Sequence, residues 1–151
     1  MTWTWTAPAG RALSGTLGIA ALLAGARIAG PRNKVLWTAA LAPDTALLLG
    51  ASAAPTWRQL PRYAIGPYNA LHSPAVPAAL LTAAALTRHR SLLVAGLAWF
   101  GHLGWDRAWG YGPRDADGFV AGRERAGEGG FRADRAGTAR PGLAAPGPRR
   151  P

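Results

Sequence analysis

The sequence predicts an all-α protein: a four-helix transmembrane bundle followed by a disordered C-terminal tail. Four long apolar runs are separated by short stretches that carry basic residues. Charge is sparse in residues 1–112, with 11 charged side chains, and dense in residues 113–151, with 13. Most tryptophans lie at the ends of the runs, where amphipathic rings favour the membrane interface. The net charge of +10 is therefore a sum, and the mean hydropathy of +0.03 an average, over two unlike parts.

The first predicted helix covers about residues 12–30. Fifteen uncharged residues, rich in Ala, Leu and Gly, lie between Arg11 and Arg27. This run is a little shorter than the roughly 20 residues that a membrane span needs. A basic residue before a short apolar segment that ends in small residues is also compatible with a cleaved secretory signal. The sequence leaves open whether this run is retained or removed.

The second and third predicted helices cover residues 35–57 and 63–87. The second run has 23 residues with Asp44 as its only charge, which is enough to cross a hydrocarbon core of about 30 Å. The third run has no formal charge when His72 is neutral, and it contains three prolines: Pro67, Pro74 and Pro77. Prolines would break this helix in water. They are tolerated in a membrane bundle where neighbouring groups satisfy the freed backbone.

The fourth predicted helix covers residues 91–111 and carries polar side chains near its end. Neither residues 13–26 nor residues 91–101 contain a charged residue at any helical angle. A helix on the surface of a soluble protein should show a polar face. The pattern therefore favours a multi-pass protein of the cell membrane over the alternative, an Ala-rich soluble helical bundle.

Domain organisation follows from the same split in composition. Residues 1–112 are predicted to form the transmembrane domain, and residues 113–151 a disordered basic tail rich in Gly, Pro and Arg. An even number of crossings places both termini on one side, and the distribution of basic residues favours the cytoplasm. Zero cysteines exclude a disulfide framework, a thiolate zinc site and a cysteine nucleophile.

The expected partner is the lipid bilayer. A nucleic-acid binder requires a basic patch with base-stacking aromatic residues, and the tail holds only two of the chain's aromatic residues. No nucleic-acid partner is therefore expected. The oligomeric state is left open.

Four ionisable side chains lie inside the apolar runs: Asp44, His72, His102 and Asp106. Such residues are costly in a bilayer, and their default interpretation is a functional site that faces the bundle interior. The first three lie roughly 15–18 Å from an end of their runs at 1.5 Å per residue, so alternating helices would bring them together near the midplane. His102 and Asp106 are four residues apart, which places them on one helical face.

These four residues allow three interpretations. They could ligate one divalent metal ion such as zinc or manganese, with a water in an open position that would act as the nucleophile of a hydrolase. They could form a proton relay, or they could only join helices by hydrogen bonds. Arg107 either snorkels to the interface or binds a phosphate-bearing substrate. No catalytic residue is predicted.

Several segments together resemble a known family. They are residues 41–44 (Leu-Ala-Pro-Asp), 68–73 (Tyr-Asn-Ala-Leu-His-Ser) and 102–112 (His-Leu-Gly-Trp-Asp-Arg-Ala-Trp-Gly-Tyr-Gly), followed by Gly118 and Phe119. This pattern is similar to the domain-of-unknown-function family DUF4260, which comprises small four-helix bacterial membrane proteins without an established activity. The resemblance covers roughly residues 13–119. The family usually continues with a Lys-Asp-Thr-His-like segment, where this chain has Val-Ala-Gly-Arg at residues 120–123.

A more distant similarity runs to membrane-bound metal-dependent hydrolases. It rests on Pro43-Asp44, on residues 71–73 and on His102 with Asp106. It implies hydrolysis of a lipid-like or phosphate-bearing substrate. That family commonly has a second aspartate where this chain has Ala46, and a His-Arg pair where this chain has Tyr68-Asn69. A complete dinuclear site is therefore not expected, and a mononuclear or vestigial one stays open.

Overall fold

The computed structural model describes residues 6–48, 50, 53 and 59–121. It confirms the predicted all-α class, because the described chain folds into helices and contains no strand beyond an isolated bridge between Arg114 and Val120. The elements are α1 (Pro8–Ala29), α2 (Lys34–Leu41), the 3-10 turn η1 (Ala42–Asp44), α3 (Thr45–Leu48), α4 (Arg62–Leu71), α5 (Ala75–Thr87) and α6 (Arg90–Trp109). They form four rods, with η1 and α3 continuing α2, and α5 continuing α4. These rods lie on the four predicted spans.

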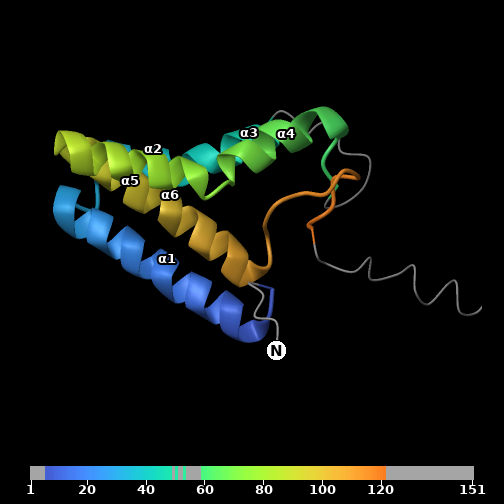
Figure 1. Cartoon of the computed structure of the whole chain (residues 1–151), viewed down its shortest axis with the longest axis horizontal. Coiled ribbons are helices and arrows are strands. Elements are labelled where there is room, and N and C mark those ends of the chain that lie inside the picture. Colours follow the sequence, from blue (N-terminus) through green and yellow to red (C-terminus); the bar gives the residue numbers. More distant parts are fainter. Residues whose placement is uncertain (1–5, 49, 51–52, 54–58, 122–151) are drawn as a thin grey trace, which may run out of the picture.

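Helix α6 is the centre of the bundle. It runs antiparallel to α1 on one side, and α2, α4 and α5 lie on its other side (Figure 1). Its buried face is made of small and medium side chains, with Val94 and Ala98 almost fully enclosed. They pack with Leu36 and Ala39 of α2 into one apolar cluster.

Glycines allow α1 and α6 to approach each other closely. All five buried residues of α1 are small: Gly10, Gly15, Gly18, Ala21 and Gly25. A Cβ atom added at Gly104 would lie 2.6 Å from the backbone oxygen of Ser14 and 2.7 Å from the Cα of Gly18. This is backbone-to-backbone packing, the kind that small residues permit between membrane helices.

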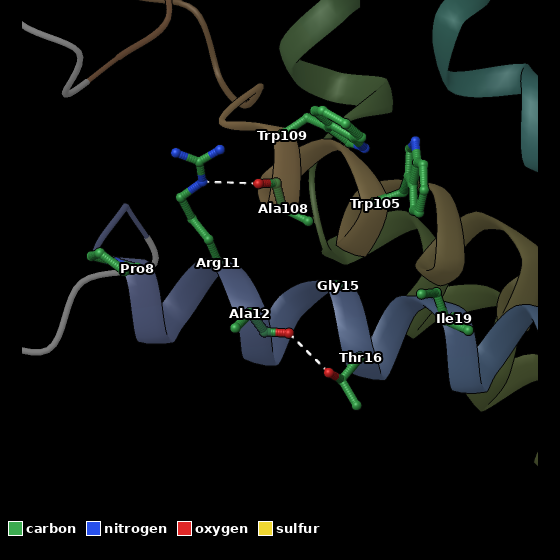
Figure 2. A pocket seen from close by; sticks show the side chains of 9 residues that line it. All are labelled: Pro8, Arg11, Ala12, Gly15, Thr16, Ile19, Trp105, Ala108 and Trp109. Carbon is green, nitrogen blue, oxygen red and sulfur yellow. Dashed lines mark hydrogen bonds between the residues drawn. The ribbon is translucent and has the colours of Figure 1, made fainter.

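Two arginines fasten the ends of this helix pair. Arg11, in the first turn of α1, donates from Nε to the carbonyl oxygen of Ala108 in the last turn of α6, at 2.8 Å (Figure 2). At the opposite end, Arg90 begins α6 and donates to the carbonyl oxygen of Ile28 in α1. Each arginine therefore satisfies a carbonyl that a helix terminus leaves without an internal partner.

The other two rods are broken. Pro43 cannot donate an amide hydrogen and its ring would clash in a continuous helix, and α2 gives way to η1 at this position. The second rod breaks between α4 and α5, where Pro74 caps the N-terminus of α5. Pro67 is accommodated inside α4 and Pro77 inside α5. The predicted continuous helix 63–87 is thus interrupted once. The predicted helix 35–57 is interrupted by η1 and is also too long, because α3 ends at Leu48 and the described residues Gly50 and Ala53 lie in a turn and a bend.

Residues 113–121 fold back onto the helices. Asn69 of α4 donates from Nδ2 to the carbonyl oxygen of Arg114 at 2.9 Å and accepts the amide of Arg114 through Oδ1 at 2.7 Å. Leu60 donates its amide to the carbonyl oxygen of Gly118 at 3.0 Å, and Gly118 has a φ of 90°, which an L side chain rarely adopts. Ordered chain therefore continues past the predicted boundary at residue 112. The rest of the predicted tail, residues 122–151, lies outside the described part.

Two described segments are long and apolar enough to cross a membrane: Pro8–Ala29 and Arg62–Thr87. They correspond to the first and third predicted spans. A buried core helix or an N-terminal signal meets the same criteria.

Candidate metal centre

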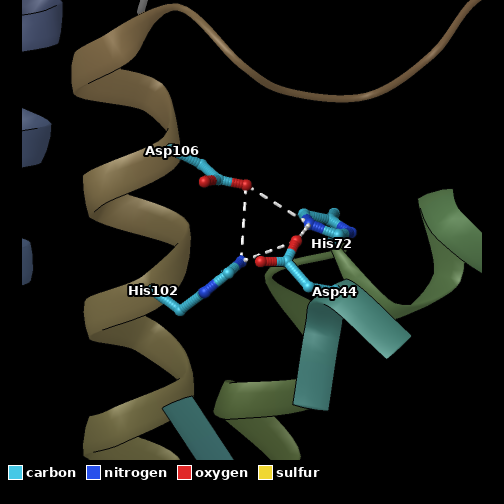
Figure 3. Close-up of side chains that lie close together, drawn as sticks. All are labelled: Asp44, His72, His102 and Asp106. Carbon is cyan, nitrogen blue, oxygen red and sulfur yellow. Dashed lines mark ion pairs between the residues drawn. The ribbon is translucent and has the colours of Figure 1, made fainter. Parts of the chain in front are cut away.

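The four polar residues from the apolar runs lie together in one cluster, which we call the Asp/His cluster (Figure 3). Asp44 is the last residue of η1 and His72 is the C-cap of α4, whereas His102 and Asp106 project from neighbouring turns of α6. One potential ligand atom from each residue lies within 4.8 Å of those from the other three.

Each imidazole Nε2 faces both carboxylates. The Nε2 atom of His72 lies 3.3 Å from Asp106 Oδ2 and 3.6 Å from Asp44 Oδ1. The Nε2 atom of His102 lies 3.4 Å and 3.6 Å from the same two oxygens. Both Nε2 atoms are buried, and neither has a hydrogen-bond partner in the described chain. A cation placed among these atoms would satisfy all four residues at once.

The backbone fixes the tautomer of His72. Its Nδ1 lies 2.9 Å from the carbonyl oxygen of Tyr68, and because a carbonyl only accepts, Nδ1 carries the proton and donates. In the neutral ring the lone pair then resides on Nε2, directed into the cluster. The ring of Tyr68 stacks on the imidazole at 3.8 Å between centroids. A ligating histidine commonly uses its second nitrogen in this way, which sets the ring's orientation.

The spacing of the ligand atoms fits a metal ion. Bonds of 2.0–2.2 Å from zinc to nitrogen and oxygen place the ligand atoms of a tetrahedron about 3.4 Å apart. The four nitrogen-to-oxygen distances in the cluster, 3.3–3.6 Å, match four of the six edges of such a tetrahedron, and all four ligand atoms lie within 4.8 Å of one another. Two imidazoles and two carboxylates also form a donor set that zinc and manganese accept.

The cluster is enclosed on one side and open on the other. The side chains of His72, His102 and Asp106 are 2%, 10% and 15% exposed, whereas that of Asp44 is 45% exposed. His72 is the one buried polar side chain among the described residues. A water or a substrate could therefore reach the cluster from the side of Asp44.

Two supporting residues were missed by the sequence reasoning. Trp99 of α6 donates from Nε1 to the carbonyl oxygen of Leu71 at 2.9 Å, at the break beside His72. Tyr68 both accepts from His72 and stacks on it. The spacing of four residues between Tyr68 and His72 was a usable signal, because such residues are neighbours on a helix. The sequence carried no comparable signal for Trp99, because its partner is a backbone carbonyl oxygen in another rod.

Arg107 and His89 lie outside the cluster. Arg107 is in the last turn of α6, where a basic side chain interacts favourably with the helix dipole. Its predicted contact with a phosphate-bearing substrate stays a prediction. His89 is exposed and occupies the N-cap position of α6, where its side chain makes no capping hydrogen bond.

The fold and the cluster define a class: a small all-helical protein in which broken helices bring two aspartates and two histidines together. The chain belongs to the family described as domain of unknown function DUF4260, whose model matches residues 33–123. This confirms the family resemblance. The match includes all four cluster residues and the segment 113–121, and it begins after α1. No curated protein and no solved structure matches the chain, so the distant similarity to hydrolases has no support from these comparisons.

Proposed function

We propose that this protein is a multi-pass membrane protein that binds one divalent transition-metal ion, such as zinc or manganese, through Asp44, His72, His102 and Asp106. The observation that carries the proposal is the geometry of the Asp/His cluster. Its four nitrogen-to-oxygen distances match four of the six edges of a tetrahedral site, and all four ligand atoms lie within 4.8 Å of one another. The His72 lone pair is aimed inward by the bond from Nδ1 to Tyr68.

The distribution of side chains on α1 supports a membrane location. Its buried residues are glycine and alanine, and Leu22 and Ile28 are partly buried against the core. Four other large apolar side chains point outward: Leu13, Leu17, Ile19 and Leu23 are 45–56% exposed. A helix in water would bury its large apolar residues and expose polar ones. The inverted pattern suits lipid, in which helices associate through small residues and present large apolar side chains to acyl chains.

Retention of α1 and the orientation complete the proposed topology. Removal of α1 as a signal would uncover the glycine face of α6, including Gly101 and Gly104, which packs against Gly18. We therefore favour a retained helix, which gives four crossings. The distribution of basic residues along the sequence favours both termini in the cytoplasm. Sedimentation of a tagged protein with carbonate-washed membranes tests the location, and recovery in the soluble fraction would contradict it.

Metal analysis of the detergent-purified protein tests the cluster. We expect about one equivalent of zinc or manganese per chain in the wild type and in His89→Ala, whose histidine is exposed and outside the cluster. His102→Ala removes one ligand and should reduce the metal content to background. Absence of stoichiometric metal from the wild type after growth in metal-supplemented medium would refute the site. Coupled losses of stability in cluster double mutants without metal would then favour the structural interpretation.

A metal-dependent hydrolase is the second candidate function. It is favoured by the exposure of Asp44, because water can approach the cluster from that side. A water that replaces Asp44, or that joins the four residues as a fifth ligand, would then be able to meet a substrate. In this version the cluster holds the ion, and the substrate approaches from the side of Asp44. Release of phosphate or of a carboxylic acid from lipid-like esters by the metal-loaded wild type, and its loss in His102→Ala, would support this candidate. A proton relay through the same residues predicts no dependence on metal.

A further inference from the structure

An open groove of about 650 Å³ lies between the start of α1 and the end of α6, away from the Asp/His cluster. Its floor on α1 is formed by small residues, among them Ala12 and Gly15, and its wall on α6 by Trp105 and Trp109. The two indole rings contact each other edge to face at 5.8 Å between centroids. They are 48% and 58% exposed, so a large aromatic surface remains uncovered.

One end of the groove is basic and the other is apolar. Pro8 and Arg11 lie at one end, Ile19 lies at the other, and Thr16 lies between them (Figure 2). Arg11 and Ile19 are eight residues apart on one helix, which corresponds to about 12 Å at 1.5 Å per residue. No acidic side chain is among the described residues that line the groove. A ligand that matches this gradient has an anionic head and an apolar tail.

The guanidinium of Arg11 is held in place through Nε, and its two terminal nitrogens remain able to donate hydrogen bonds to a ligand. Its Nε atom donates to the carbonyl oxygen of Ala108, and the group lies beside the turn at Gly110, 3.5–3.7 Å from where a Cβ atom would stand. Neither terminal nitrogen is hydrogen-bonded to a residue that the structure describes. A planar guanidinium with two free nitrogens matches two oxygens of a phosphate. Its orientation is already fixed by the bond to α6.

We propose that this groove binds one anionic phospholipid, with its phosphate at Arg11 and an acyl chain along α1 toward Ile19, flanked by Trp105 and Trp109. Tryptophan rings favour the level of lipid headgroups. The positive charge of Arg11 favours a headgroup with a net negative charge over a zwitterionic headgroup, whose own cation already neutralises the phosphate. The proposal rests on the membrane location proposed above and is independent of the metal ion. It assigns a lipid ligand to a surface that lies partly outside the family match, because α1 precedes residue 33.

Native mass spectrometry of delipidated protein in detergent, titrated with dioleoylphosphatidylglycerol, tests the proposal. We expect one tightly bound lipid in the wild type and about tenfold weaker binding in Arg11→Gln, because a hydrogen bond to a charged group is lost. Arg32→Gln removes the same charge from an exposed position outside the groove and should bind as the wild type does. Ala12→Phe fills the groove and leaves Arg11 in place, so it should also weaken binding. Its matched control, Ala20→Phe, alters an exposed position of α1 outside the groove.

Four other results of these lipid-binding experiments would overturn the proposal. Equal binding by Arg11→Gln, Ala12→Phe and the wild type would show that the groove holds no lipid. Equal binding of dioleoylphosphatidylcholine would refute selection of an anionic headgroup, and displacement by millimolar glycerol 3-phosphate would identify a soluble phosphate ester as the ligand. Dimers that Ala12→Phe dissociates would identify a second copy of the chain as the occupant. Because metal content is measured on the same samples and membrane sedimentation on the same wild type, failure here is distinguishable from failure of the proposed function.

Discussion

The helix pair α1–α6 and the broken rods on the other side of α6 are built in opposite ways. In the pair, two unbroken helices approach through glycines, and a Cβ atom at Gly101 or Gly104 would collide with the partner helix. In the broken rods, prolines interrupt the helices and polar side chains occupy the interruptions. Asp44 and His72 are both located at such breaks.

The two constructions serve the cluster differently: the helix pair holds α6 in place, and the helix breaks orient side chains toward it. The glycine contacts and the two terminal arginine bonds hold α6 against α1, and this fixes the position of the helical face that carries His102 and Asp106. The breaks expose backbone groups that need partners, and they turn side chains into the bundle at angles that a continuous helix does not offer. Irregular backbone at membrane depth is tolerated where it lines a polar cavity. The cluster draws two residues, His102 and Asp106, from the unbroken helix α6, and two, Asp44 and His72, from the helix breaks.

The largest effect is expected from breaking the glycine contact. Gly104→Leu would force α1 and α6 apart, because its Cβ atom alone would meet the backbone of Ser14 and Gly18. We expect a loss of about 3 kcal/mol or more in the free energy of unfolding, measured as denaturant-induced unfolding in detergent. Gly66→Leu is the matched control, because nothing lies within 4 Å of a Cβ atom at Gly66. Equal destabilisation by both variants would show that the α1–α6 contact is not a close glycine contact.

A smaller effect is expected from releasing the segment 113–121 from α4. Asn69→Ala removes both side-chain bonds to Arg114, at a cost of about 1–3 kcal/mol. We expect faster tryptic cleavage after Arg114 with the helices intact. Asn33→Ala removes the N-cap of α2, whose side chain accepts from Leu36, at a cost of about 1 kcal/mol. It should leave cleavage at Arg114 unchanged, and an equal increase in both variants would indicate general loosening instead.

The smallest effect is expected from removing the hydrogen bond that Trp99 makes at the break between α4 and α5, next to His72. Trp99→Phe removes the donor to the carbonyl oxygen of Leu71 and keeps the aromatic packing. We expect roughly tenfold weaker metal binding, as is typical when a group that orients a ligand is lost, measured by competition with a chelator. Trp37→Phe removes a similar bond, from Nε1 to the carbonyl oxygen of Pro31 at 2.7 Å, remote from the cluster. An unchanged affinity in Trp99→Phe would mean that the break is held by other contacts.

The regular half of the molecule could be predicted from the sequence more closely than the broken half. The predicted helices at residues 12–30 and 91–111 agree with α1 and α6 to within a few residues, because uncharged runs and flanking basic residues mark helix ends. The prolines were visible, but their outcomes were not. Pro67 and Pro77 stay inside helices, while Pro43 and Pro74 stand at breaks. Which proline interrupts a rod depends on the groups that surround the freed backbone, and these come from other rods.

Within the Asp/His cluster, too, the features set by local helix geometry could be predicted and those set by packing could not. Spacing alone placed His102 and Asp106 on one helical face, because local geometry decides it. The approach of Asp44 and His72 was expected from their depth in the apolar runs, but their positions at helix breaks and the bond from His72 to Tyr68 depend on packing. The boundary at residue 112 followed the change in composition. The ordered turn beyond it depends on bonds to Asn69 and Leu60, which lie in a distant part of the sequence.

The arrangement of the cluster along the chain has a consequence for chain entropy. His102 and Asp106 are near neighbours in one helix, whereas Asp44 and His72 come from segments separated from them by long stretches of chain. An ion held by all four would close these stretches into loops, and closing a long loop removes freedom from the unfolded chain. In a chain without a single cysteine, such an ion would serve as the cross-link that a disulfide supplies elsewhere. It would join the proline-broken rods to α6 at one point.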